Sequence, residues 1–234
     1  MITMIDTSRI AWAGEETRII LANASAYFGK NERIGILAAP GSGKSTLARL
    51  LSGIEAPDEG YILRDGLVSW PLGFAGAFHP DLTLADNILF LSDLIGQRGA
   101  DLISFCESFG GIGSEMNSLA KHISPGVRLA AAMSLSLSAQ YDMYIADETI
   151  GFGDNETRNK SRAMLEQRLT NAGLIFISRN PRQLSELCER FLVLIGGQLK
   201  PCQSPEVGAQ ALELYDKKAA CRLIETESQP KLEA

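Results

Sequence analysis

Short apolar runs alternate with longer segments of helical spacing along most of the chain. An apolar run bounded by turn residues indicates a strand, and apolar residues at every third or fourth position indicate a helix. The expected strands are Arg33–Ala38, Asp142–Ala146, Leu174–Ser178 and Phe191–Ile195, and the expected helices are Lys44–Ser52, Asn155–Leu169 and Pro181–Glu189. This alternation predicts an α/β fold with a largely parallel core sheet. Gly196-Gly197 indicates a hairpin turn.

The segment from about residue 80 to residue 138 follows a different pattern. Its apolar residues recur at helical spacing, as in Ile88, Leu91 and Leu94, and strand character is low. We interpret it as a helical subdomain inserted into the α/β core. With no Pro/Ser-rich linker and no internal repeat, residues 1–234 are expected to form a single domain that ends in a polar tail from about residue 225 to 234.

The amino-acid composition limits the kinds of molecule that this chain is expected to bind. The chain has 234 residues, of which 45% are hydrophobic and 21% charged, as in a globular protein. A formal net charge of −6 argues against general nucleic-acid binding, which needs a basic face, so no nucleic-acid partner is expected. No apolar run approaches the roughly 20 residues that span a bilayer. If the chain works at a membrane, we expect a partner to hold it there.

A glycine-rich turn joins the strand Arg33–Ala38 to the next helix, which is the setting that a phosphate-binding P-loop requires. The predicted nucleotide-binding residues are Pro40, Gly41, Ser42, Gly43, Lys44, Ser45 and Thr46. Gly41 and Gly43 let the backbone curl so that consecutive N–H groups face a phosphate. Lys44 is expected to reach the β- and γ-phosphates of a bound nucleotide, and the Ser45 hydroxyl is placed to ligate Mg²⁺. Ala38 replaces the usual first glycine. The alternative is an ordinary strand–helix turn.

A pair of carboxylates follows the strand Asp142–Ala146, at the sheet edge where open α/β folds bind ligands. Asp147 is predicted to hold Mg²⁺, mostly through water, and Glu148 to act as the general base that polarises the attacking water. Taken alone, two acidic residues after a strand are usually just exposed to solvent at the end of that strand. Together with the P-loop, the catalytic interpretation is favoured.

Several further strings accompany these two motifs: Ser69–Phe74, Phe78, Leu82-Thr83, Asp86-Asn87, Phe90, Arg128–Leu137 and Gly151–Asp154. With them, the chain resembles the ATP-binding subunits of ABC transporters over roughly residues 9 to 200. More narrowly, it resembles the branch that energises export of capsular polysaccharide. The resemblance implies a P-loop NTPase fold of the ABC-type ATPase, with ATP and Mg²⁺ as cofactors.

The same resemblance implies partners. It implies a dimer of ATP-binding subunits, homomeric or heteromeric, that sandwiches two ATP molecules and drives a transmembrane permease subunit from the cytoplasmic face of the inner (plasma) membrane. The signature loop, which closes on the partner's ATP, falls at Ser124 to Gly126, although a plain helix start is the alternative there. Trp12 is the candidate that stacks on adenine, and a core or surface tryptophan is the alternative.

Two positions depart from the family's catalytic pattern. The glutamine that senses Mg²⁺ and water falls at His79, and the switch histidine falls at Arg179. Arginine binds phosphate through two N–H groups at once. It does not orient the attacking water in the way that a histidine does. We therefore expect ATP binding with low intrinsic turnover. The alternatives are a regulatory subunit that pairs with a competent paralogue, and a kinase built on a P-loop.

Overall fold

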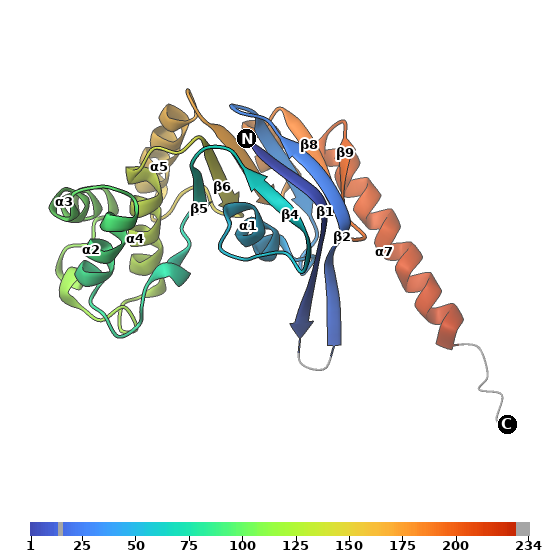
Figure 1. Ribbon diagram of the computed structural model, residues 1–234, viewed down its shortest axis with the longest axis horizontal. Helices are drawn as coiled ribbons and strands as arrows, with labels where there is room; N and C mark the ends of the chain where they lie inside the picture. Colours follow the sequence, from blue (N-terminus) through green and yellow to red (C-terminus); the bar gives the residue numbers. More distant parts are fainter. Residues whose placement is uncertain (14–15, 228–234) are drawn as a thin grey trace.

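The computed structural model describes residues 1–13 and 16–227, with the side chains of residues 1–11 and 17–216. It contains two sheets with a helix between them (Figure 1). The six-stranded sheet has the order β5-β6-β7-β3-β8-β9, and the three-stranded sheet has the order β2-β1-β4.

The six-stranded sheet confirms the predicted α/β core. Its strands are β3 (Arg33–Ala38), β5 (Val68–Pro71), β6 (Met143–Asp147), β7 (Gly173–Ser178), β8 (Arg190–Ile195) and β9 (Gln198–Cys202). All neighbours pair in parallel except β8 and β9, which the turn at Gly196-Gly197 joins as a hairpin. The predicted strands are present, with ends that differ by one residue at most. The P-loop after β3 and the two acids after β6 therefore share the carboxyl edge of the parallel sheet, with β7 between the two strands.

The three-stranded sheet was not predicted. It contains β1 (Ile2–Ala13), β2 (Glu16–Phe28) and β4 (Glu59–Arg64), all antiparallel. Register shifts interrupt the pairing of β1, and Asp6 and Asn23 adopt positive φ angles of 46° and 49° beside them. Short polar side chains tolerate this backbone conformation better than β-branched ones. The shifts break the strict alternation by which a half-buried strand is recognised.

Helix α1 (Lys44–Ser52) lies between the two sheets and joins them in one core (Figure 1). Its apolar face, formed by Leu47, Leu50 and Leu51, is fully buried. These residues pack with Ile2 of β1 and Ile36 of β3, among others. The helix that follows the P-loop is thus held from both sides, which fixes the position of the loop itself.

A helical segment follows β5 and precedes β6, as predicted. It contains the 3₁₀ turns η1 (Ala75–Ala77) and η2 (Ser114–Asn117) and the helices α2 (Leu84–Leu94), α3 (Gly99–Gly110) and α4 (Pro125–Ser138). These helices lie to one side of the parallel sheet (Figure 1). Their core residues, including Leu84, Ile88 and Leu102, are continuous with those on the second face of that sheet.

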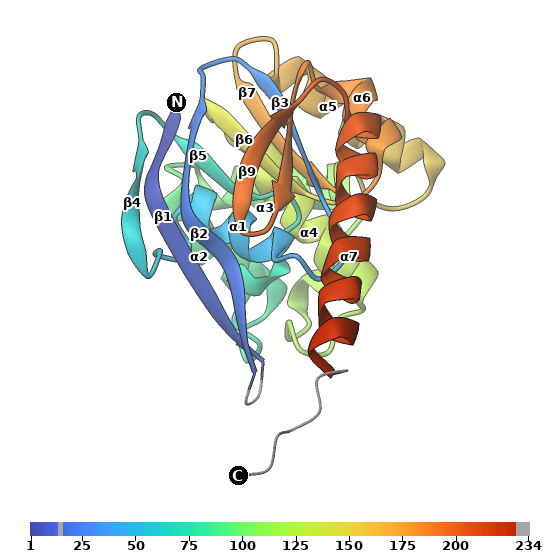
Figure 2. The ribbon, with the colours of Figure 1, turned by 90° about the vertical axis from the view of Figure 1, so that its right-hand side faces the viewer.

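Three helices pack with that second face: α5 (Asn155–Arg168), α6 (Pro181–Leu187) and α7 (Pro205–Glu227). Figure 2 shows α7 beside β9, and it also contacts β8 and α6. Helix α7 continues to Glu227, so residues 225–227 of the predicted polar tail are helical and the rest of that tail, from residue 228, lies outside the described residues. Among the described ranges, no helix has the length and apolar character needed to cross a bilayer.

Candidate active site

The P-loop leaves β3 at Ala38 and enters α1 at Lys44. Gly41 and Gly43 adopt left-handed φ angles of 72° and 93°, which glycine reaches without strain. A Cβ at Gly43 would lie 2.5 Å from the side chain of Ile20, so this position also has no room for a larger residue. Ala38 is buried, pairs with Leu194 of β8 and is not in the left-handed region. Alanine therefore fits the position where the family has glycine.

The carbonyl oxygen of Ala39 closes the loop. It accepts hydrogen bonds from the Ser42 N–H at 3.2 Å, the Ser42 hydroxyl at 2.8 Å and the Lys44 ammonium at 3.0 Å. The same ammonium lies 3.4 Å from Oε1 of Glu148. Lys44 is thus placed between the loop and the Glu148 carboxylate. The loop geometry leaves backbone N–H groups at the start of α1 free to bind an anion.

Glu148 occupies a constrained position directly after β6. Its φ angle is 59°, an uncommon conformation for a residue with a Cβ. Its N–H donates to the Ile177 carbonyl at 2.9 Å. Its Oε2 accepts hydrogen bonds from the Ser178 hydroxyl at 2.8 Å and from the Arg179 N–H at 3.3 Å. Strained backbone held by several contacts is typical of functional residues.

Asp147 ends β6, and its environment fits a cation. Its Oδ1 is buried and has no hydrogen-bond donor in the described part of the chain. A buried carboxylate oxygen without a partner is costly, and a bound cation removes that cost. Ser45, at the second position of α1, is exposed and offers a hydroxyl ligand. A carboxylate and a hydroxyl are hard oxygen donors of the kind that Mg²⁺ takes.

The structure brings five of the predicted residues together around one pocket of about 520 Å³. Its lining is Pro40, Gly41, Lys44, Glu148, Arg179, Asn180 and Gln183. Two of these, Asn180 and Gln183, were not predicted, and neither was Ser178, which holds Glu148. Ser178 was visible as the last residue of the strand before Arg179, but one serine at a strand end carries no specific signal. The pocket combines a phosphate loop, a lysine, an arginine and a carboxylate.

Among the predicted residues outside the P-loop and the pair of acids, three described ones do not line this pocket. His79 is exposed, and its Nδ1 accepts a hydrogen bond from the Asp81 N–H at 3.3 Å. Ser124 is the N-cap of α4, where its hydroxyl accepts from the Val127 N–H at 3.2 Å. Gly126 follows Pro125 at the exposed start of the same helix. The side chain of Trp12 lies outside the described residues.

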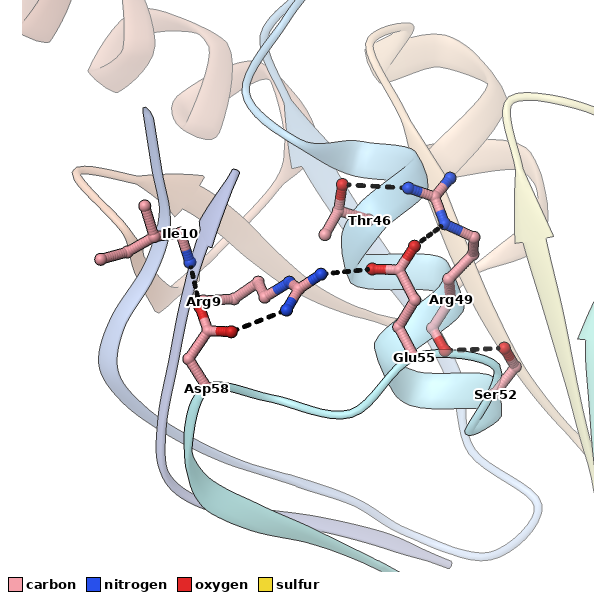
Figure 3. Close-up of polar contacts among 7 residues, drawn as sticks. All are labelled: Arg9, Ile10, Thr46, Arg49, Ser52, Glu55 and Asp58. Atoms are coloured by element: carbon pink, nitrogen blue, oxygen red, sulfur yellow. Dashed lines mark hydrogen bonds and ion pairs between the residues drawn. The ribbon is translucent and has the colours of Figure 1, made fainter. Parts of the chain in front are cut away.

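Thr46, the last residue of the P-loop, forms a hydrogen bond with Arg49, which lies three residues further along α1 (Figure 3). Its hydroxyl accepts a hydrogen bond from Nη2 of Arg49 at 3.3 Å. Arg49 also pairs with Glu55 in the segment that follows α1. The orientation of Thr46 is therefore set by charged residues outside the loop.

The model of the family described as ABC transporter matches residues 21–151, more than half of the chain. The chain belongs to the ABC transporter family. It carries the fold of an ABC ATPase, and it binds ATP. Membership also explains the helical segment, because the match extends from β2 across that segment to the residues after Glu148.

Three proteins with similar sequences are each named as ATP-binding proteins. This ABC ATPase is 36% identical over 180 residues to the ATP-binding protein BexA of Haemophilus influenzae, with 77% of this chain and 83% of the relative covered. It is 33% identical over 199 residues to the capsule polysaccharide export ATP-binding protein CtrD of Neisseria meningitidis serogroup B, with 85% and 92% covered. It is 32% identical to the polysialic acid transport ATP-binding protein KpsT of Escherichia coli, with 73% and 78% covered.

Solved structures agree at the level of the fold. The dimeric post-hydrolysis state of the ATP-binding cassette MJ0796, bound to ADP and Pi, superposes with a TM-score of 0.67. The alignment covers 88% of this ABC ATPase and 99% of that chain at 18% identity. A second dimeric structure of the same cassette gives a TM-score of 0.65. The predicted fold class is confirmed.

Proposed function

We propose that this chain hydrolyses Mg²⁺-ATP to energise export of a polysaccharide through a membrane partner. The observation that carries the proposal is the position of Glu148, 3.4 Å from the P-loop lysine and held by Ser178 and Arg179. The names of the relatives CtrD and KpsT support the choice of a polysaccharide as cargo.

The chemistry follows from the charges around the pocket. The P-loop N–H groups and Lys44 bind the triphosphate, and the negative charge of the phosphates competes with Glu148 for the Lys44 ammonium. Once that contact is exchanged, Oε1 of Glu148 is free to accept a proton from the attacking water. The hydrogen bond from the Ser178 hydroxyl to Oε2 remains and fixes the orientation of the Glu148 carboxylate. Arg179 adds a permanent positive charge beside the phosphates.

Ser45 and Asp147 are proposed to hold Mg²⁺, which would neutralise charge on the phosphate oxygens during hydrolysis. The buried Oδ1 of Asp147, with no donor among the described residues, supports this assignment.

We also propose that the working unit is a dimer. Ser124 and Gly126 lie at the exposed start of α4 and do not line the pocket of their own chain. At the N-terminus of α4, Pro125 has no N–H and the Val127 N–H donates to Ser124, so the Gly126 N–H is the group offered to an anion. In a dimer this N–H would meet the γ-phosphate held by the partner copy, as in the signature loop of the family. Closure would also bring His79 to its position near the phosphates.

The membrane partner is proposed to dock on the helical segment, which would hold the chain at the cytoplasmic face of the inner membrane. Phe90 is 62% exposed and Leu94 is 68% exposed, both on α2. Phe78, by contrast, is 8% exposed and belongs to the core. The alternative, a regulatory subunit that has lost its site, is disfavoured because Glu148 and its supporting contacts are present.

Export in cells tests the proposal. Deleting the coding sequence should abolish surface polysaccharide and leave the polymer inside, and the wild-type chain should restore it. Glu148→Gln, made at equal protein level, should not restore it. Surface and internal polymer would be measured by immunoblotting. Normal surface polysaccharide in the deletion strain would contradict the assigned cargo.

A further inference from the structure

The loop that follows β7 holds the Glu148 carboxylate from one side. Ser178, fully buried at the end of the strand, donates its hydroxyl hydrogen to Oε2 at 2.8 Å. The N–H of Arg179 donates to the same oxygen at 3.3 Å. The other oxygen, Oε1, lies 3.4 Å from the Lys44 ammonium. Whatever fixes the direction of the Ser178 hydroxyl therefore fixes the direction of this carboxylate.

Three groups surround the Ser178 hydroxyl. Its Oγ accepts a hydrogen bond from the Asn180 N–H at 3.1 Å, and it lies 2.8 Å from Oε2 of Glu148 and 3.4 Å from the side-chain amide oxygen of Gln183. A hydroxyl has one hydrogen and accepts up to two hydrogen bonds. The hydrogen goes to Glu148, because that contact is shorter and its acceptor is charged. The contact with Gln183 then needs a donor, which the amide supplies when it turns over and places its NH₂ group against Ser178.

Gln183 has the position of a helix-capping residue but makes a different contact. It is the third residue of α6, whose N-cap is Asn180. In a capping box, a glutamine at this position accepts a hydrogen bond from the N–H of the N-cap residue. Here the Asn180 N–H donates to Ser178 instead, and the Gln183 side chain reaches the same Oγ. Both groups are thus directed at the hydroxyl that holds Glu148.

The start of α6 is satisfied without the Gln183 side chain. The side-chain oxygen of Asn180 accepts a hydrogen bond from the Arg182 N–H at 3.1 Å, and Pro181 at the first helical position has no N–H to satisfy. Gln183 is partly buried and lines the pocket that contains Lys44 and Glu148. Its place in the structure therefore favours a role in the site over a role in the helix.

We propose that Gln183 is a positioning residue for ATP hydrolysis, and the proposal rests on the proposed role of Glu148 as general base. The amide NH₂ of Gln183 occupies the second acceptor site of Ser178 and leaves the hydroxyl hydrogen to Glu148. Without this amide the hydroxyl turns about its Cβ–Oγ bond, and the carboxylate loses a fixed orientation. Binding of ATP depends on the P-loop and Lys44 instead. Gln183 therefore controls the rate of turnover and not the affinity for nucleotide.

Phosphate release at saturating Mg²⁺-ATP, together with the dissociation constant for Mg²⁺-ATP, tests this role. Gln183→Leu should lower the rate about tenfold, because a base that is poorly oriented is less effective, and should change the dissociation constant less than twofold. Ser178→Ala should lower the rate by a similar factor. The double variant should be no slower than Ser178→Ala alone, because Gln183 acts through Ser178. Gln167→Leu is the matched control, since Gln167 is an exposed glutamine of α5 outside the pocket, and it should change neither quantity.

An unchanged or faster rate in Gln183→Leu would overturn the proposal. So would losses that multiply to about a hundredfold in the double variant, since Gln183 would then act without Ser178. Weaker ATP binding together with a lower midpoint of thermal unfolding would leave Gln183 a merely structural role. Glu148→Gln separates these failures from failure of the proposed base. If Glu148→Gln slows release and Gln183→Leu does not, only the role of Gln183 is wrong; if Glu148→Gln leaves the rate unchanged, both roles are wrong.

Discussion

At the scale of the residue, the carboxylate of Glu148, the proposed general base, is held by several surrounding groups. Glu148 has a positive φ angle, and three groups on different elements contact its oxygens: Lys44, Ser178 and the Arg179 N–H. A non-glycine residue in this conformation costs of order 1 kcal/mol or more and persists only where the surroundings fix it. The geometry therefore aims one oxygen at the phosphate loop.

Arg179 is expected to limit turnover. Replacing it with histidine, Arg179→His, should raise the rate of phosphate release about tenfold or more, because a neutral imidazole can orient the attacking water where a guanidinium holds phosphate. The rate would be measured at saturating ATP. Arg182→His is the control, since Arg182 is exposed on α6 and does not line the pocket. An unchanged rate in Arg179→His would show that Arg179 does not limit hydrolysis.

Two buried cysteines should be unreactive in the folded protein. Burial raises the pKa of the Cys106 and Cys188 thiols to about 12, so almost no thiolate exists at pH 8. Iodoacetamide followed by peptide mass spectrometry should label both only after denaturation. Cys202, which is partly exposed, serves as the internal comparison. Rapid labelling of Cys106 in native buffer would contradict the packing of α3.

Sequence could predict Lys44, Glu148 and Arg179 because each lies at a fixed place relative to a strand end. The contacts that join them bring together residues far apart along the chain, such as Ser178 with Glu148 or Arg9 with Glu55. No local pattern encodes such pairs. Their discovery required the fold.

At the scale of the element, the parallel core was predictable and the antiparallel sheet was not. Apart from Arg33 and Ser178 at their ends, the runs that form β3 and β7 have no polar side chain, because both faces of that sheet are buried. In β1 and β2 the pattern is broken at the register shifts near Asp6 and Asn23. An interrupted alternation gives no clear period, so sequence alone did not indicate these strands.

Gly60 provides a test of this sheet. It has a φ angle of 72°, and a Cβ there would lie 2.3 Å from the Asp6 carbonyl oxygen. Gly60→Ala should lower the free energy of unfolding by about 3 kcal/mol or more, from strain together with the backbone clash.

Gly96 is the matched position for that experiment. Its φ angle is 66°, but a Cβ there would have no atom within 4 Å apart from its own chain neighbours. Gly96→Ala should therefore cost only about 1 kcal/mol, from strain alone. Denaturant unfolding would measure both. Equal losses in the two variants would show that β4 does not approach β1 as described.

At the scale of the whole molecule, the proposed dimer would make the site half of a larger one. The exposed start of α4 does not line the pocket of its own chain. A composite site of this kind would make ATP the link between two copies. Hydrolysis would then separate them.

Glu148→Gln should stabilise that dimer. With Mg²⁺-ATP present, its mass in solution should double from the 25.3 kDa of one chain, because binding is kept and hydrolysis is removed. Adding Gly126→Glu should keep it monomeric, since a carboxylate would repel the phosphate and the site leaves room for the side chain. Light scattering would measure the mass. A dimer that forms equally well with Gly126→Glu would contradict the role given to α4.

Phosphate release by the purified chain tests the central claim most directly. We expect slow release that Glu148→Gln reduces at least a hundredfold while ATP binding remains, and Lys44→Ala should lose ATP binding itself. Release that is the same with and without Glu148, or tight ATP binding with no release, would contradict the account of this site as a working ATPase.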